Sequence, residues 1–175
     1  MNPLLSLLIT SAGAAAGAVG KALWDQLMAR QEELSRIRRD KKIQLLERQL
    51  SEFYWPIYIR LEKDNLIWEK VFDQNSGVDP AVQKTLETTH ILPNHQEVME
   101  ILSNKIHLAR AREPLAKALS DYIRHIAVYQ AIRQAGIHDR DPLQFGEPYP
   151  TEIFKLIESE KNRLQAEYDR LLGFV

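Results

Sequence analysis

The sequence of 175 residues contains no cysteine. This absence excludes a disulfide framework and any metal site built on thiolates. The chain also lacks a P-loop, a Rossmann glycine pattern, an HExxH zinc motif and a nucleophile elbow. Its formal net charge of −1 argues against a dedicated nucleic-acid binder. These absences favour a protein that is not an enzyme and that uses no cofactor, no nucleic acid and no small-molecule substrate.

Residues 2–20 lack any charged side chain. As a helix, the run from Pro3 to Gly20 is about 27 Å long, whereas a bilayer core is about 30 Å thick. The helix spans the core if it continues to Trp24, with the Lys21 ammonium reaching the headgroups and the Trp24 ring at the interface. We therefore predict a single transmembrane anchor over residues 1–24.

Basic residues are concentrated directly after the uncharged run. Residues 1–42 contain seven Lys or Arg and four Asp or Glu, whereas the remaining residues contain sixteen and twenty. Because loops rich in Lys and Arg stay in the cytoplasm, we predict an outside N-terminus and a cytoplasmic body, in the inner (cytoplasmic) membrane. The residues predicted to contact membrane lipid at the headgroups are Lys21, Trp24, Arg36, Arg38, Arg39, Lys41 and Lys42.

Two other interpretations of the N-terminus fit the residues less well. A secretory signal has a basic region before its apolar stretch, but residues 1–3 carry no Lys or Arg, although the later AGAAAGA run supplies a cleavage-like site. A helix that lies in the membrane interface has a charged face, which residues 4–20 lack. The transmembrane interpretation is therefore preferred.

Small residues recur within the predicted anchor. Gly13 and Gly17 form a GxxxG pair, and Thr10 and Ala14 extend a second small-residue row at spacing four. Such a face lets another helix approach closely in lipid. It predicts a homo-oligomer or contact with another membrane protein, although small residues are also common in simple anchors.

Residues 25–52 are predicted to form a basic juxtamembrane stalk helix. Apolar residues recur at alternating spacings of four and three, at Leu23, Leu27, Leu34 and Ile37. Arg30 occupies one position of this row, Lys41 and Gln44 interrupt it, and a second row restarts out of step at Leu46. Two short rows indicate a stalk helix and not a long coiled coil. The alternative is an amphipathic helix packed on its own bundle.

The remaining residues, 53–175, are predicted to form a soluble all-α bundle of about five helices. Pro56 disfavours helical geometry at the preceding residue, so the stalk helix should end or kink there. Later helices are predicted to begin at Asp79-Pro80, at Asn94 with Glu97 as a capping box, at Glu113-Pro114 and at about Thr151. Gly136 is predicted to end one helix, and the proline-rich segment 136–150 to cap one end of the bundle.

Candidate catalytic or metal-binding groups are few. Glu87 and His90 form one ExxH pair, which di-iron bundles use twice, so they are weak candidates for metal ligands. His138-Asp139 matches the dyad of metal-dependent phosphohydrolases but lies in the proline-rich segment. Asp121 and His125 share a helix face at spacing four, which is also the spacing of an ordinary surface pair. We therefore predict no catalytic residue and no bound metal.

These features favour a membrane-anchored helical interaction protein, an accessory or assembly subunit that holds a protein partner at the cytoplasmic face. The alternative is a membrane-active effector whose Gly/Ala-rich helices oligomerise into a pore. A third hypothesis is a metal-dependent helical-bundle enzyme. A pore requires a small or polar face along the whole span, whereas a tether tolerates any apolar sequence, so the anchor separates the first two.

Overall fold

The computed structural model describes the backbone of residues 3–72 and 77–174, and their side chains except those of residues 3–20, 22, 23 and 72. Within these ranges the regular elements are all helical and no strand is present. The prediction of an all-α chain is therefore confirmed. The physical basis is the 3.6-residue recurrence of apolar side chains along most of the sequence.

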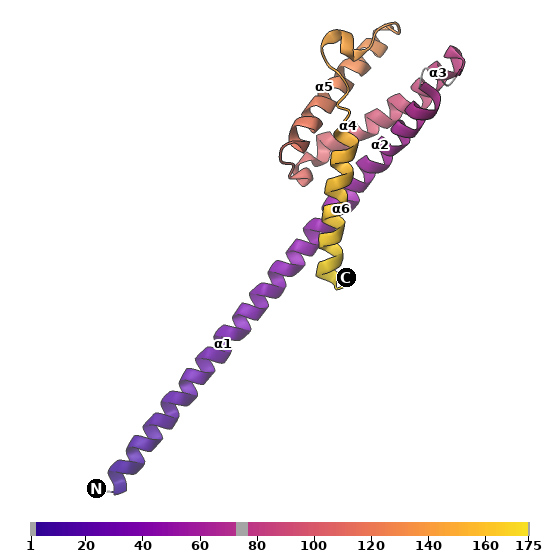
Figure 1. Cartoon of the computed structure of the whole chain (residues 1–175). Coiled ribbons are helices and arrows are strands. Elements are labelled where there is room, and N and C mark those ends of the chain that lie inside the picture. Colours follow the sequence, from indigo (N-terminus) through magenta and orange to yellow (C-terminus); the bar gives the residue numbers. More distant parts are fainter. Residues whose placement is uncertain (1–2, 73–76, 175) are drawn as a thin grey trace. The chain divides into compact units, whose positions relative to one another are not determined.

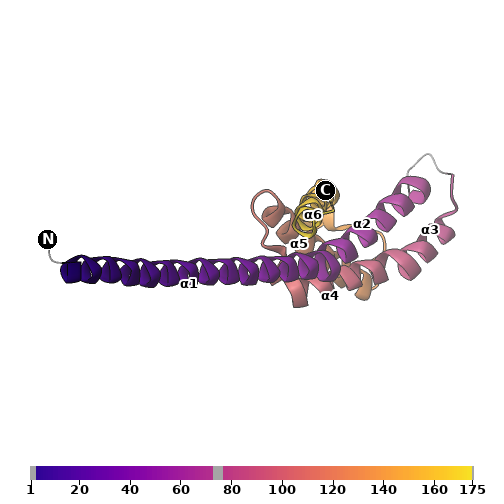
Figure 2. The same cartoon turned by 90° about the horizontal axis from the view of Figure 1, so that it is seen from below.

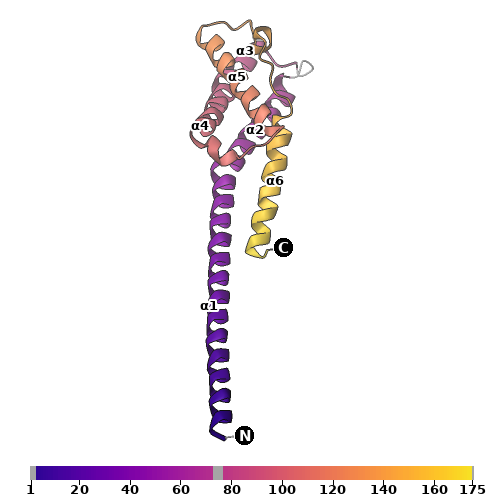
Figure 3. The ribbon, with the colours of Figure 1, turned by 90° about the vertical axis from the view of Figure 1, so that its left-hand side faces the viewer.

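The chain divides into two compact units, residues 1–44 and 45–175. The first unit consists of most of helix α1 (Pro3–Gln49), which Figure 3 shows as one uninterrupted helix. Its 47 residues correspond to about 70 Å of α-helix. No proline follows Pro3 within α1, so nothing in its interior removes a backbone hydrogen bond.

The second unit is a helical bundle. Its elements are η1 (Leu50–Tyr54), α2 (Trp55–Ile67), η2 (Trp68–Phe72), α3 (Pro80–Leu86), η3 (Glu87–Ile91), α4 (Leu92–Ala109), α5 (Leu115–Gln134), η4 (Pro142–Phe145) and α6 (Ile153–Leu172). Helices α2 and α4 lie side by side, and α6 packs against both α2 and α5 (Figures 1 and 2).

Two prolines are accommodated by wide helical turns. Pro56 lies in the first turn of α2, as predicted, but Trp55 before it keeps right-handed helical geometry (φ −63°, ψ −46°), and the chain stays helical through the π-helical segment η1. The N–H group of Trp55 bonds to the carbonyl of Leu50, five residues back. Segment η3 is followed in the same way by Pro93 in the first turn of α4. The wider turn keeps the chain helical where proline cannot donate a hydrogen bond.

Most of the predicted helix termini are confirmed. The Asp79 side chain accepts a hydrogen bond from the N–H of Ala81 at 2.7 Å and so caps α3. Helix α5 begins directly after Glu113-Pro114, and the chain leaves it at Gly136, whose φ is +75°. Helix α6 begins two residues after Thr151.

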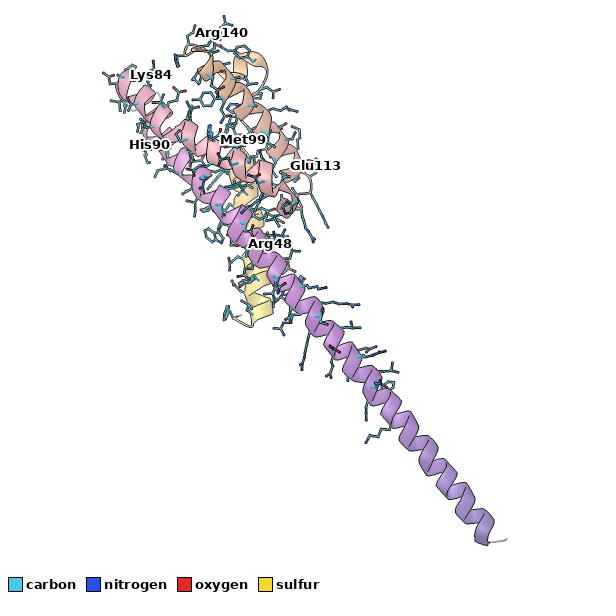
Figure 4. All side chains as sticks on the ribbon, turned by 180° about the vertical axis from the view of Figure 1, so that it is seen from behind. Arg48, Lys84, His90, Met99, Glu113 and Arg140 are labelled. Atoms are coloured by element: carbon cyan, nitrogen blue, oxygen red, sulfur yellow. The ribbon has the colours of Figure 1, made fainter. Side chains whose placement is uncertain are left out.

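The capping box predicted at Asn94 is wrong. Residues 80–109 form one helical run through α3, η3 and α4, along which Figure 4 labels Lys84, His90 and Met99. Asn94 lies inside this run and its side-chain amide donates to the carbonyl of Arg60 at 2.7 Å. Glu97 forms an ion pair with the Arg60 guanidinium at 2.6 Å. Both residues therefore join α4 to α2 and do not start a helix.

The core of the bundle is formed within residues 46–164. Its largest fully buried side chains include Phe53, Tyr54, Ile57, Leu61, Tyr122, Ile126 and Ile157. Two buried polar groups close the end of α4, because Tyr54 donates to the carbonyl of Ala109 and Gln49 to that of Leu108, each at 2.7 Å. These bonds satisfy carbonyls that a helix terminus leaves unpaired.

Among the residues covered by the structure, no helix contains a stretch long and apolar enough to cross a membrane. The predicted anchor depends on the side chains of residues 3–20, which lie outside the described part.

Candidate functional site

The described side chains of α1 up to Lys42 form an exposed surface. Lys21 and every residue from Trp24 to Lys42 are exposed, and these include all the predicted headgroup contacts. Apolar side chains share this exposure: Trp24 is 65%, Leu27 58%, Leu34 52% and Ile37 42% accessible. The predicted packing residues Gly13, Gly17, Ala14 and Thr10 belong to α1, but their side chains lie outside the described part.

A second candidate site is a buried acid–imidazole pair inside the bundle. Asp64 of α2 and His95 of α4 have side chains that are only 9% and 7% accessible. His95 Nε2 lies 3.2 Å from Asp64 Oδ2, in an orientation that does not form a hydrogen bond. A small rotation of either side chain would align the two groups for a hydrogen bond.

Aromatic rings surround this pair. The His95 ring makes edge contacts with Tyr122 and Tyr129 of α5, with centroids 6.0 and 5.8 Å away, and Tyr149 contacts Tyr122 at 6.0 Å. Burial, together with the nearby Tyr149 and Asp64, raises the pKa of Tyr122 well above its ordinary value. Burial and then Asp64 raise the pKa of Tyr149. Both phenols are therefore neutral at physiological pH.

Several buried polar atoms of this cluster have no hydrogen-bond partner among the described residues. They are both carboxylate oxygens of Asp64, Nδ1 of His95 and the hydroxyl of Tyr122. An unsatisfied buried polar group costs about 1–3 kcal/mol. In native proteins internal water or a bound group usually satisfies such atoms. The cluster can therefore bind internal water or another small polar group.

The Asp121–His125 pair does not act as a unit. Asp121 forms ion pairs with Lys117 and Arg124, while Nδ1 of His125 lies 2.8 Å from the carbonyl of Glu147. Burial lowers the pKa of His125, opposed by the Glu147 carbonyl, which raises it. The neutral imidazole therefore donates to that carbonyl and ties the proline-rich segment to α5.

The two residues of the ExxH pair have different environments. Glu87 accepts hydrogen bonds from the Tyr129 hydroxyl and from Nε of Arg133, the latter at 2.7 Å, whereas His90 is exposed. Arg133 also donates to the carbonyls of Ile137 and Arg140. Glu87 therefore holds an arginine that fixes the start of the proline-rich segment.

No group of three or more His, Cys, Asp or Glu side chains suited to a metal ion occurs among the described residues. His138 and Asp139 are both exposed, in the segment after α5.

Sequence reasoning missed Asp64 and His95. A signal was present, because Asp64 continues the buried row of Ile57 and Leu61, and His95 continues the row of Ile91 and Val98. A charged or polar residue on an apolar helix row is unusual and indicates a buried pair. The pairing itself depends on how α2 packs on α4.

Comparisons with protein-family models, with curated proteins and with solved structures found no match to this chain.

Proposed function

We propose that the chain is a membrane-anchored interaction protein, an accessory or assembly subunit that holds a partner protein at the cytoplasmic face of the membrane. The observation that carries this proposal is the exposure of apolar side chains on α1. Trp24, Leu27, Met28, Leu34 and Ile37 are each between 42% and 65% accessible. All five lie within a stretch of α1 in which every described side chain is exposed, so none of them packs on a core of its own.

The energetics favour a partner for this helix. Burial of apolar surface contributes roughly 25 cal/mol per Å², and most helical stability in proteins comes from such packing. The bundle, in contrast, has its own core, formed from residues 46–164. Residues 24–42 have no such core, so a partner that covers their apolar side chains would stabilise this part of the helix.

The membrane location rests on the sequence. Residues 2–20 carry no charge, and Lys and Arg outnumber Asp and Glu by seven to four within residues 1–42. This order predicts an N-terminus outside and the bundle in the cytoplasm. Lys21 and Trp24, both exposed, are the residue types that anchor a helix at the interface.

Two measurements, of membrane attachment and of topology, test the proposal. The full chain should resist extraction from membranes by alkaline carbonate. A reporter that is active only in the cytoplasm should be active when it is fused after Val175. Release of the chain by carbonate, or a mature form that begins near Ala18, would contradict the membrane anchor and favour a cleaved signal.

A further inference from the structure

We infer that the partner of α1 is a helix of a different protein, parallel to α1, whose contact face is apolar and carries carboxylates. This inference rests on the proposed function, because the parallel direction follows if both helices continue from N-terminal anchors in the same membrane. The contact face on α1, called the seam below, consists of Leu27, Arg30, Leu34, Ile37 and Lys41.

The seam is continuous and accessible. Its five positions fall within a strip about 80° wide on a helix with 3.6 residues per turn. Leu27, Leu34 and Ile37 are 58%, 52% and 42% accessible, and Arg30 and Lys41 are exposed. The alternating spacings of three and four residues match the a and d positions of a coiled coil. The seam therefore has the geometry of a helix-pairing face.

A second copy of the chain does not fit this face well. In a parallel two-stranded pair, identical a and d positions face each other, so Arg30 would meet Arg30 and Lys41 would meet Lys41. Like charges that face each other in a partly desolvated seam repel more strongly than they do in water. Two of the five seam positions would therefore oppose pairing between copies.

Charges beside the seam favour pairing between copies only weakly. Glu33 and Arg38 occupy flanking positions that attract each other across a parallel pair of identical helices. Both side chains are exposed, and exposed ion pairs of this kind contribute little. The repulsion within the seam therefore outweighs the attraction at its edges.

A partner with Asp or Glu opposite Arg30 and Lys41 converts both repulsive positions into ion pairs. Its other contact positions are apolar, to match Leu27, Leu34 and Ile37. Arginine in particular forms bidentate bonds to carboxylates in such interfaces. The charge of the seam thus specifies the chemistry of its partner.

Synthetic peptides test this specificity on the full chain in mild detergent. The probe copies residues 21–44 with Arg30→Glu and Lys41→Glu. The control carries the same two charge changes away from the seam, as Arg36→Glu and Lys42→Glu, and a third peptide keeps the native sequence. We expect the probe to bind on the order of tenfold more tightly than either of the other two.

Direction is read from the same peptides by disulfide cross-linking. The chain has no cysteine, so Gln26→Cys introduces a single thiol near the start of the seam. A probe with a cysteine at its N-terminal end should cross-link to this thiol, and a probe with a C-terminal cysteine should not. Cross-linking through the C-terminal cysteine would contradict the parallel arrangement.

Equal binding of probe and control would overturn the inference, because only net charge would then matter. Equal binding of probe and native peptide would overturn it in favour of a second copy. These outcomes differ from failure of the proposed function, in which carbonate releases the chain. If the chain resists carbonate but binds the three peptides equally, this inference is wrong and the proposed function still stands.

Discussion

Asp64 and His95 illustrate how single residues limit the stability of the bundle. Each occupies a helix position otherwise taken by apolar side chains, and each has at least one atom without a hydrogen-bond partner among the described residues. Removing one member of a buried polar pair leaves the other without its partner, which is more costly than replacing both by apolar residues. The pair therefore couples α2 to α4.

The variant His95→Ala should lose about 3 kcal/mol of unfolding free energy, because Asp64 is left buried without its partner. The double variant Asp64→Leu, His95→Ala should recover part of this loss, since neither buried polar group remains without its partner. Urea unfolding of the full chain in detergent measures both. Additive losses in the double variant would show that the two residues do not interact.

His125 gives the bundle a predictable dependence on pH. Burial lowers its pKa in the folded state below the ordinary value of 6.5. The unfolded chain therefore binds a proton first as the pH falls, and stability is lost between about pH 6.5 and the lower folded pKa. The bundle should thus unfold more readily at pH 5 than at pH 7.

The variant His125→Asn removes this titration and retains a donor for the Glu147 carbonyl. Its stability should fall less between pH 7 and pH 5 than that of the native chain, as measured by thermal unfolding at both values. An exposed histidine, His107, provides the matched control as His107→Asn. An identical fall in all three proteins would exclude His125 as the source.

Among the elements, α6 is attached to α2 by an aromatic and cationic contact. The Lys161 ammonium lies 3.9 Å from the ring centroid of Trp55 and 4.3 Å from that of Tyr58, and Tyr58 stacks on Phe154 of α6. Lys161 is buried although it carries a charge. Cation–π attraction to two rings offsets part of the cost of its burial.

The variant Lys161→Met keeps most of the aliphatic stem and removes the charge. Since cation–π pairs contribute about 1 kcal/mol when partly desolvated, it should lose roughly that amount of unfolding free energy. The matched control is Lys155→Met, an exposed position on the same helix, which should change stability by less than about 0.5 kcal/mol. Urea unfolding distinguishes the two, and equal effects would argue against the aromatic contact.

Helix α1 contains the small residues proposed to pack in the membrane. The double variant Gly13→Leu, Gly17→Leu raises hydrophobicity, so insertion should persist while assembly in mild detergent weakens. Chemical cross-linking of native membranes measures the assembly. Unchanged cross-links in the double variant would show that the anchor is a simple tether. If overexpression of the native chain is toxic and that of the double variant is not, with insertion intact, the pore hypothesis is supported.

At the scale of the whole molecule, the two units differ in how they are stabilised. The bundle buries its own core from Leu46 to Leu164, whereas the described side chains of residues 24–42 are all exposed. The bundle thus has the core that independent folding requires, whereas the apolar residues between Trp24 and Lys42 can be buried only against lipid or a partner.

A fragment of residues 45–175 should therefore fold without α1. We expect a helical circular-dichroism spectrum and one cooperative unfolding transition. Its midpoint should lie within a few degrees of the temperature at which residues 45–175 unfold in the full chain. A fragment of residues 21–44 alone should show little helix in water, because it has no core. A disordered 45–175 fragment would contradict the independence of the bundle.

The sequence by itself determined the all-α class, the cap at Asp79 and the start of α5 and α6. These features depend on local chemistry, since caps, prolines and helical periodicity act over a few neighbouring residues. It also placed Pro56 in the first turn of a helix, although it did not predict the π-helical turn that keeps the chain helical there.

Only the tertiary structure decided which polar side chains meet. Asp64 and His95 lie on different helices. Asn94 donates to the carbonyl of Arg60 and does not cap a helix of its own. Glu87 pairs with Arg133 and not with His90. Each of these contacts depends on how one helix rotates and packs against another. Periodicity identifies the buried row of each helix, but the packing of the helices decides which residues of two rows come together.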